Sequence, residues 1–416
     1  MKKKNLQENQ KNPQNKTLKL ILITLLAIGI VSGSTVAIYV NSMLDKVNYE
    51  GEINMSVDPN LEEEEKIDFS IDETTTSAPD KKDDSDKAPD KNTSTTKPST
   101  NKTSDNLVAI YKVENGVNKE YKVPADKLKQ EAAVIQQQAD KDIQQNITND
   151  TSIWYSDDVY NLLIVGYDAG EKEAVMFEGM QYPRSDSMII ASINKKKKTI
   201  KLVSLSRATY VAIKDHGNKR LNTAHAFGGA KTLIETIESN YKVRIDNYVS
   251  VDFKGFSSII DAMNGVSVDM SAIEANYAFN KEDLKAGNYT LNGKQALRFV
   301  RLRQTDSDRQ RTGRQRKVLT SIFDKFKTQS LTQQLDFMET VLPYVTTDMN
   351  KGQLSRRIAE AQSYLEYNLT EDIIPHNAIK LTLKEGKEVI ILDWAETTSY
   401  IHKILYDGVE VKKIEA

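Results

Sequence analysis

A long apolar run near the start of the chain, residues 20–40, sets the strongest limit on what this sequence can fold into. As a helix with a rise of about 1.5 Å per residue, the run just crosses a bilayer core of about 30 Å. The lysines before it favour a cytoplasmic basic tail over residues 1–19 and place everything after Asn41 outside the cytoplasm. We therefore expect a transmembrane anchor over residues 20–40.

The alternative for this run is a cleaved signal peptide, because Thr35, Val36 and Ala37 resemble a small-residue cleavage site. The run is longer than the roughly 7–15 apolar residues usual in a signal peptide, which favours an uncleaved anchor. The expected localisation is the cell membrane, with a single span and an extracellular main domain. Because the chain has no cysteine, disulfides, zinc–thiolate sites and cysteine nucleophiles are excluded, and a Gram-positive surface fits better than an oxidising periplasm.

Residues 41–106 have the composition of a disordered linker. They contain an acidic run at 62–65 and two copies of Ala-Pro-Asp-Lys, at 78–81 and 88–91, among Ser, Thr, Asn and Lys. Such a segment buries too little apolar surface to offset its chain entropy. We interpret it as a spacer that carries the folded part away from the membrane.

Residues 107–150 predict a small accessory lobe. Residues 107–123 have the pattern of a hairpin, with Asn115 and Gly116 as the turn. After Pro124, apolar residues keep a helical period as far as Ile143. We expect this lobe to pack on the domain that follows.

Residues 151–416 alternate short apolar runs with amphipathic segments. Strands are expected over residues 160–165, 187–193, 199–205, 245–251, 265–270 and 389–393, and helices over residues 229–241, 253–263, 353–367 and 396–405. This alternation predicts an α/β fold, an α-β-α sandwich around a mixed central sheet.

Arginine is concentrated in one stretch of this domain. Seven of the thirteen arginines lie between Arg298 and Arg316. Since the guanidinium fork grips two phosphate or carboxylate oxygens at once, the cluster indicates an oxyanion site. The alternative is a solvated basic helix interrupted by acidic residues such as Asp306 and Asp308.

Spacing within the stretch suggests which arginines converge. Residues 297–302 read as a short strand, in which Arg301 and Arg303 share a face. From Arg309 onward the period is helical, which places Arg311, Arg314 and Gln315 on one face. Arg309 and Arg316 are expected on the solvent side of the same helix.

Polar residues also follow the predicted strands, where sites in α/β sheets usually lie. Asp168 ends the first strand, Asp186 opens the second and Arg207 ends the third. Two carboxylates beside arginines suit a phosphate ligand bridged by Mg²⁺ or Mn²⁺. The alternative is a set of turn caps with a buried ion pair.

Eight motifs now suggest a family. In chain order they are NLLIVGYD, RSDSMIIASI, KLVSLSR, RLNTAHAFGG, VDFKGF, DAMNGV, LNGKQALRFVRLR and DRQRTGRQ. This series, within residues 161–326, resembles the catalytic domain of the LytR-CpsA-Psr family. The resemblance implies a transferase of the Gram-positive envelope that moves an anionic glycopolymer, such as teichoic acid or capsule, from undecaprenyl pyrophosphate to peptidoglycan. It also implies an apolar tunnel for the prenyl chain.

The resemblance also implies roles for individual residues. Asp168 and Asp186 match the aspartates that bind Mg²⁺, and Asp308 matches an acidic residue proposed to act near the acceptor. The residues that match the pyrophosphate-contacting set are Arg207, Arg301, Arg303, Arg311 and Gln315, to which the shared helix face adds Arg314. The catalytic residues expected are Arg207, Arg301, Arg303 and Asp308.

The chain departs from the family pattern where many members carry an acid, at Ala208, and again at Ala169 and Gly170. One alternative is therefore a surface protein that binds polyprenyl pyrophosphate but transfers weakly or not at all. Another is a nucleic-acid regulator, which the expected extracellular location and the net charge of −2 argue against. The expected partners are the lipid-linked polymer, peptidoglycan and the membrane, and no nucleic acid.

Overall fold

The structure is a computed structural model. It describes residues 42–50, 107–114, 117–169, 180–302, 308–376, 378–382 and 388–415. The predicted tail and anchor, residues 1–40, lie outside the described residues, as does most of the predicted linker. Among the residues described, no helix is both long and apolar enough to cross a membrane.

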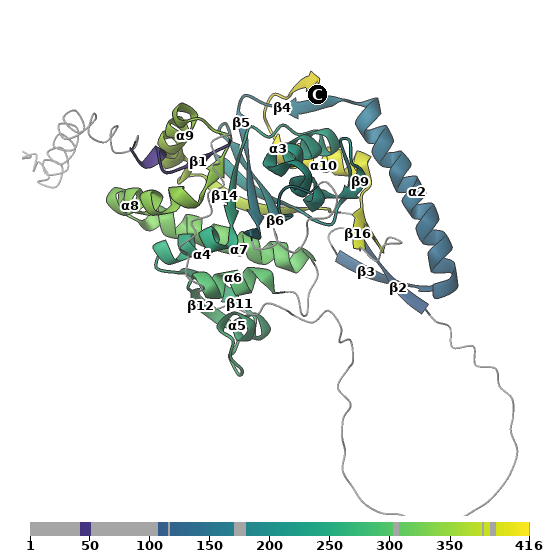
Figure 1. The fold of residues 1–416 in the computed structure, drawn as a ribbon, viewed down its shortest axis with the longest axis horizontal. Coiled ribbons are helices and arrows are strands. Elements are labelled where there is room, and N and C mark those ends of the chain that lie inside the picture. Colours follow the sequence, from purple (N-terminus) through teal and green to yellow (C-terminus); the bar gives the residue numbers. More distant parts are fainter. Residues whose placement is uncertain are drawn as a thin grey trace, which may run out of the picture. The chain divides into compact units, whose positions relative to one another are not determined.

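A mixed seven-stranded sheet forms the centre of the fold (Figure 1). In spatial order its strands are β1 (Asn48–Tyr49), β13 (Thr346–Thr347), β10 (Asn247–Asp252), β5 (Val159–Tyr167), β6 (Ser185–Asn194), β7 (Thr199–Leu205) and β14 (Asn368–Ile374). β5 runs parallel to β10 and antiparallel to β6, while β7 runs antiparallel to β6 and parallel to β14. The prediction of an α/β fold with a mixed central sheet is confirmed.

Helices cover both faces of this sheet. Because successive strand residues point to opposite faces, Leu163 and Met188 pack toward one helical layer and Ile189 and Leu202 toward the other. The first layer contains α2 (Ala125–Asn149), α3 (Leu221–Tyr241) and α10 (Trp394–Leu405). The second contains α7 (Asp308–Thr328), α8 (Leu331–Val341) and α9 (Lys351–Tyr364).

Smaller sheets join distant parts of the chain. The predicted hairpin forms from β2 (Leu107–Glu114) and β3 (Val117–Pro124), although its turn residues lie outside the described part. β2 also pairs with β15 (Ala378–Thr382), and β15 with β16 (Glu388–Ile391), so backbone bonds tie residues 107–124 to the C-terminal region. The remaining pairs here are β4 (Ser152–Tyr155) with β17 (Lys412–Glu415), and β8 (Tyr210–Ile213) with β9 (Gly217–Arg220).

A second apolar core lies beside the sheet. It is built from α4 (Phe253–Ala262), β11 (Val266–Met270), α5 (Ala272–Phe279), β12 (Gly287–Leu291), α6 (Gly293–Arg301) and part of α7. The strand expected over residues 265–270 is present as β11, but it pairs with β12 in a separate two-stranded sheet. A short 3₁₀ helix, η2 (Leu342–Tyr344), follows α8.

The strand expected over residues 297–302 is wrong, because residues 297–301 form the second half of helix α6 and Leu302 is its C-cap. The helix begins with a capping box in which Asn292 and Gln295 each accept a hydrogen bond from the other's backbone N–H, both at 2.9 Å. Ala296, Phe299 and Val300 then bury one helical face. Gly293 permits close packing on α4, since an added Cβ would lie 2.2 Å from the carbonyl oxygen of Ser257.

The predicted linker begins too early, because residues 42–50 belong to the fold. β1 pairs in parallel with β13, and Figure 1 shows it beside α8 and α9. Met43 and Leu44 are 0% and 1% exposed, and Val47 is also buried. This spacing places the three apolar side chains on one side of a helical turn, a pattern hidden by the polar residues that follow.

Candidate oxyanion site at the carboxyl edge of the sheet

Three strand ends bring the predicted polar residues to one edge of the sheet. Tyr167 at the end of β5 pairs with Ser185 at the start of β6 and with Asp252 at the end of β10. β7, antiparallel to β6, ends at the same edge. Asp168, Asp186 and Arg207 therefore leave the sheet side by side, as the strand-end argument predicts.

Two ion pairs define this edge. One Nη of Arg207 lies 2.6 Å from a carboxylate oxygen of Asp186, and their side chains are 19% and 15% exposed. An Nη of Arg301 lies 3.4 Å from the carboxylate of Asp168. Both pairs are half-buried, so solvent screens them less than it screens a surface pair.

Arg301 reaches the edge from the C-terminal end of α6. Its guanidinium carbon lies 4.5 Å from the ring centroid of Phe253, the first residue of α4. A ring at this distance attracts the cation and limits its orientation. Sequence reasoning missed Phe253, although it directly follows the strand β10 and the strand-end argument could have found it.

Helix α7 contributes Gln315. Its Nε2 donates to the backbone carbonyl of Asp186 at 3.5 Å, which ties α7 to the start of β6. Its Oε1 is buried and has no hydrogen-bond partner in the described part of the chain. Arg311 lies one turn earlier on the same helix face and is 5% exposed. Gln315 therefore reaches the edge.

Two other arginines of the cluster are built into the protein interior. Arg314 is 2% exposed, donates to the carbonyl of Leu302 at 2.5 Å and lies 3.5 Å from the carboxylate of Glu274. This placement favours a structural role over the predicted pyrophosphate contact. Arg316 binds Glu371 at 3.0 Å and donates to Ser204 at 2.7 Å. The expectation that Arg316 faces solvent is wrong.

Two predicted residues are not placed. Arg303 lies outside the described residues, and so does the side chain of Asp308. The backbone of Asp308 is the first residue of α7, two turns before Gln315. Their predicted roles therefore stay predictions.

The start of α3 closes the other side of the edge. The backbone N–H of Asn222 donates to the carbonyl of Arg207 at 3.2 Å. His225 is 5% exposed, with Nδ1 2.6 Å from the carbonyl oxygen of Pro183 and its ring stacked on Tyr167. Burial lowers the pKa of His225, so its imidazole is neutral at pH 7. Burial, and to a smaller extent the negative charge of Asp252, raise the pKa of Tyr167. The Tyr167 hydroxyl therefore stays protonated at pH 7.

The arrangement suits an anionic ligand held by arginine. Exchange of a carboxylate partner for phosphate would keep each guanidinium satisfied, because both ligands present paired oxygens. No group of three or more His, Cys, Asp and Glu that could hold a metal occurs among the described residues. A metal at this edge would therefore need oxygens from a ligand or water in addition to Asp168 and Asp186.

The fold and this edge define an α/β protein with an arginine-rich candidate oxyanion site at its strand ends. The model of the LytR_cpsA_psr family matches residues 120–397. Because this match covers more than half of the chain, the protein belongs to the LytR_cpsA_psr family, and the resemblance drawn from the motifs is confirmed.

Two curated relatives have named activities. The chain is 35% identical over 178 residues to the polyisoprenyl-teichoic acid–peptidoglycan teichoic acid transferase TagT of Bacillus subtilis, covering 42% of this chain and 54% of TagT. It is 33% identical over 197 residues to TagU of Enterococcus faecalis, covering 46% of this chain and 62% of TagU. The chain thus matches little more than half the length of these relatives.

Solved structures agree with the fold. A structure of TagT bound to LI-WTA matches with a TM-score of 0.50 and 26% identity over 61% of this chain and 91% of that one. The crystal structure of B. subtilis TagV matches with a TM-score of 0.50 and 25% identity, over 61% and 98%.

Proposed function

We propose that this protein transfers an anionic glycopolymer, such as teichoic acid or a capsule-like polymer, from a polyprenyl-pyrophosphate carrier to peptidoglycan outside the cytoplasm. The observation that carries the proposal is the pairing of Arg207 with Asp186 and of Arg301 with Asp168 at one sheet edge. The relatives TagT and TagU, named as teichoic acid transferases, support the choice of substrates.

The proposed reaction exchanges one bond to phosphorus for another. The acceptor hydroxyl oxygen bonds to the phosphorus that carries the polymer, and the bond from this phosphorus to the prenyl phosphate breaks. The prenyl phosphate leaves with the electron pair of that bond. We assign the hydroxyl proton to Asp308.

The arginines would act on the charge that develops during this exchange. Charge grows on the non-bridging and leaving oxygens of the pyrophosphate, and guanidinium groups held there in advance lower the barrier. The aspartates orient Arg207 and Arg301 before the ligand arrives, and Phe253 limits the movement of Arg301. We propose Arg303, Arg311 and Gln315 as further contacts of the pyrophosphate.

Asp168 and Asp186 would hold Mg²⁺, or Mn²⁺, together with pyrophosphate oxygens and water. Two carboxylates and phosphate oxygens form the hard oxygen set that Mg²⁺ prefers, so the residues present fit the ion. Bound there, the ion would neutralise charge on the pyrophosphate.

The prenyl chain would lie in the apolar layer between the sheet and helices α7 and α9. Leu162, Ile164, Leu319 and Phe323 are only partly buried in this layer, which leaves apolar surface for a hydrocarbon chain. We also propose that residues 20–40 anchor the protein in the membrane, where such a carrier resides.

Release of polyprenyl phosphate tests the proposal. The full chain in detergent micelles is incubated with Mg²⁺, a lipid-linked teichoic acid precursor and a peptidoglycan oligomer, and prenyl phosphate and polymer-bearing oligomer are quantified. The wild type should form both in equal amounts, and Asp186→Asn should form neither. Hydrolysis without polymer transfer, or no turnover, would contradict the proposal.

A second candidate is a polyprenyl-pyrophosphate-binding protein with weak or no transfer. It is favoured by Ala208, which directly follows Arg207 where many family members carry an acid and is 8% exposed. Its carbonyl accepts a hydrogen bond from the Ile390 N–H at 2.9 Å, so the position belongs to the packed edge of the site. Carrier binding without release of prenyl phosphate would favour this candidate.

A further inference from the structure

The first part of the predicted linker is bound to the folded body. We call residues 42–50 the docked segment. Asn48 donates from its backbone to Val345 at 3.1 Å, and Glu50 does so to Thr347 at 3.0 Å. The Asn48 side chain adds a bond to the carbonyl of Pro343 at 3.0 Å.

Side chains lock the same segment. Met43, Leu44 and Val47 share an apolar cluster with residues of η2, α8 and α9. Lys46 pairs with Glu339 of α8 at 2.7 Å, and Asp45 pairs with Lys351 at the start of α9. The chain thus joins the body at Met43, before residues 51–106 rather than after them.

This connection limits how far the body can stand from a bilayer. If the proposed anchor ends at Val40, the chain to Met43 spans at most about 11 Å. The headgroup zone on each side of the hydrocarbon core is itself about 5–8 Å thick. Residues 51–106 add no reach, because they follow the docked segment. The spacer role expected of the linker therefore does not apply to the distance between anchor and body.

The surface next to the docked segment is suited to such contact. We call the exposed side chains of residues 331–344 the α8–η2 face. Leu331 is 67% exposed and Tyr344 is 37% exposed. Among the exposed residues of this stretch, Asp336 is the single one with a carboxylate or a cationic side chain. Glu339, whose side chain is 36% exposed, is paired with Lys46. Tyrosine is enriched at membrane interfaces, and a face with few charges loses little hydration there.

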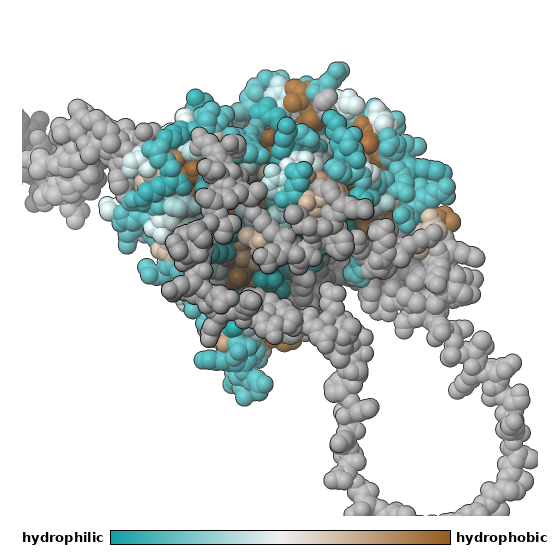
Figure 2. Space-filling view, viewed as in Figure 1, coloured by the Kyte–Doolittle hydropathy of each residue, from teal (hydrophilic) through white to brown (hydrophobic). Residues whose placement is uncertain are grey.

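We propose that the docked segment holds the α8–η2 face against the headgroups of the bilayer. The proposal rests on the membrane anchor given under the proposed function. Exposed apolar residues alone do not identify a membrane-binding face, because such residues are common on protein surfaces. Figure 2 shows hydrophobic side chains scattered among hydrophilic ones. The short connection at Met43 keeps the α8–η2 face close to the membrane, which is why we choose this face and name the bilayer as its partner.

Single cysteines can test the proposal without background, because the chain contains none. Full-length Leu331→Cys and Tyr344→Cys are labelled with a fluorophore and reconstituted into phosphatidylglycerol and phosphatidylethanolamine vesicles that carry a headgroup nitroxide quencher. Val134→Cys on α2 and Ile273→Cys on α5 are the controls. Val134 is 66% exposed, which matches Leu331, and lies on the opposite helical layer (Figure 1).

Labels at positions 331 and 344 should be quenched several-fold more than labels at 134 and 273. Equal quenching at all four positions, or stronger quenching at the controls, would overturn the proposal. A long Gly-Ser insertion between Asn41 and Ser42 should abolish the difference, and a difference that survives would overturn the docked segment as its cause.

Two separate readouts distinguish this proposal from the proposed function. Flotation of the protein with vesicles is measured first, and a chain that does not float refutes the anchor and the proposal with it. Polyprenyl-pyrophosphate binding is measured in detergent, where the face has no bilayer to meet. If the protein does not bind the carrier but labels at 331 and 344 are still quenched more than the controls, the proposed transferase function is refuted and the proposed membrane orientation is not.

Discussion

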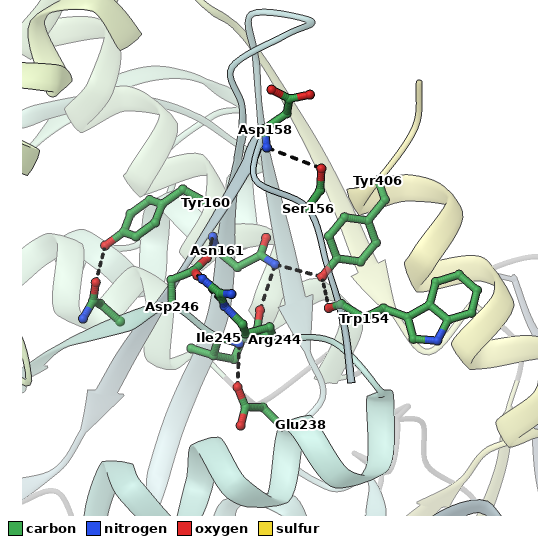
Figure 3. A network of polar contacts seen from close by, with 11 residues as sticks. Trp154, Ser156, Asp158, Tyr160, Asn161, Glu238, Arg244, Ile245, Asp246 and Tyr406 are labelled. Atoms are coloured by element: carbon green, nitrogen blue, oxygen red, sulfur yellow. Dashed lines mark hydrogen bonds and ion pairs between the residues drawn. The ribbon is translucent and has the colours of Figure 1, made fainter. Parts of the chain in front are cut away.

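The two ends of the central sheet use the same residue types for different purposes. At the carboxyl edge, Arg207 and Arg301 hold the side chains of Asp186 and Asp168. At the opposite end, where β5 and β10 begin, carboxylates accept hydrogen bonds from backbone N–H groups (Figure 3). Asp246 binds Arg244 and accepts from the Asn161 N–H at 2.8 Å.

Further bonds in Figure 3 follow the same pattern. Glu238 accepts from the Ile245 N–H at 2.8 Å, and the Asn161 amide donates to the Arg244 carbonyl at 2.9 Å. The Tyr406 hydroxyl donates to the Trp154 carbonyl at 2.6 Å. Charges bound to backbone groups join segments and stabilise the fold. Charges that pair with each other at strand ends can exchange partners with a ligand.

The largest expected effect is on stability, from a mutation in the network of Figure 3. Asp246→Ala should lower the free energy of unfolding by about 3 kcal/mol, because it removes the partner of Arg244 and of a backbone N–H. We place it at the lower end of the range for such pairs because the Arg244 side chain is 39% exposed. Denaturant unfolding checks this value. Asp186→Ala, the matched change at the other end, should cost less stability and abolish transfer, and the reverse result would refute the comparison.

The second effect is a pH dependence near the same network. Burial lowers the pKa of His402 from 6.5 to about 4. The neutral imidazole therefore contributes fully to the free energy of unfolding above pH 6.5, and this contribution is lost as the pH falls toward 4. The loss should reach about 3 kcal/mol. Burial raises the pKa of Glu238 from 4.5 to about 6. The protonated carboxyl therefore contributes fully to the free energy of unfolding below pH 4.5, and this contribution is lost as the pH rises through 6.

Differences between variants isolate these two groups from other titrations. Between pH 7 and pH 4, the stability gap between wild type and His402→Gln should move against the wild type. For Glu238→Gln the gap should move toward the wild type over the same range. Unfolding curves at several pH values measure both gaps, and gaps that do not change with pH would show that neither group is perturbed in this way.

The third effect is on ligand affinity at the carboxyl edge. Arg207→Lys and Arg301→Lys keep the charge but lose the planar fork, so polyprenyl-pyrophosphate affinity should fall about tenfold or more, or roughly 1.5–3 kcal/mol. Titration with a short-chain polyprenyl pyrophosphate at fixed salt measures this. Arg309→Lys should bind like wild type, and Arg316→Lys should lose stability rather than affinity. Similar small losses in all four variants would mean that these arginines are not a site.

The smallest effect concerns α3, which connects the two ends. Its first half packs at the oxyanion edge through His225, and its second half carries Glu238 of the network. The halves meet at a kink where Gly229 has φ +64°, a conformation that L-residues adopt at a cost. With ψ at −153°, the residue lies in a region that is essentially restricted to glycine, so Gly229→Ala should lower stability by about 1–2 kcal/mol in thermal unfolding.

Gly313→Ala in α7 is the control for this prediction. Its nearest neighbour to an added Cβ is a terminal nitrogen of Arg316 at 3.9 Å, so the methyl group fits. Ala should then stabilise the helix by about 1 kcal/mol, because Gly is the poorer helix former. A gain in stability at both positions would show that the kink at Gly229 carries no strain.

Local sequence patterns determined the α/β order of elements and the location of part of the site. Apolar runs predicted β5, β6 and β7, and polar residues after them placed Asp168, Asp186 and Arg207 at one edge, because neighbouring strands end together. The sequence also contains the capping signal of Asn292 and Gln295, which indicates a helix start and opposes a strand over residues 297–302.

Tertiary structure alone decided which arginines of the cluster lie at the strand-end edge. Arg301 reaches the edge beside Asp168, whereas Arg314 and Arg316 lie in the interior beside Glu274 and Glu371. All three have similar sequence surroundings, and their partners come from residues far away in the chain. Periodicity assigns a residue to a helix face but does not say what packs on that face. The same limit hid the docking of Met43 and Leu44, because the cluster that buries them is supplied by residues about 300 positions later.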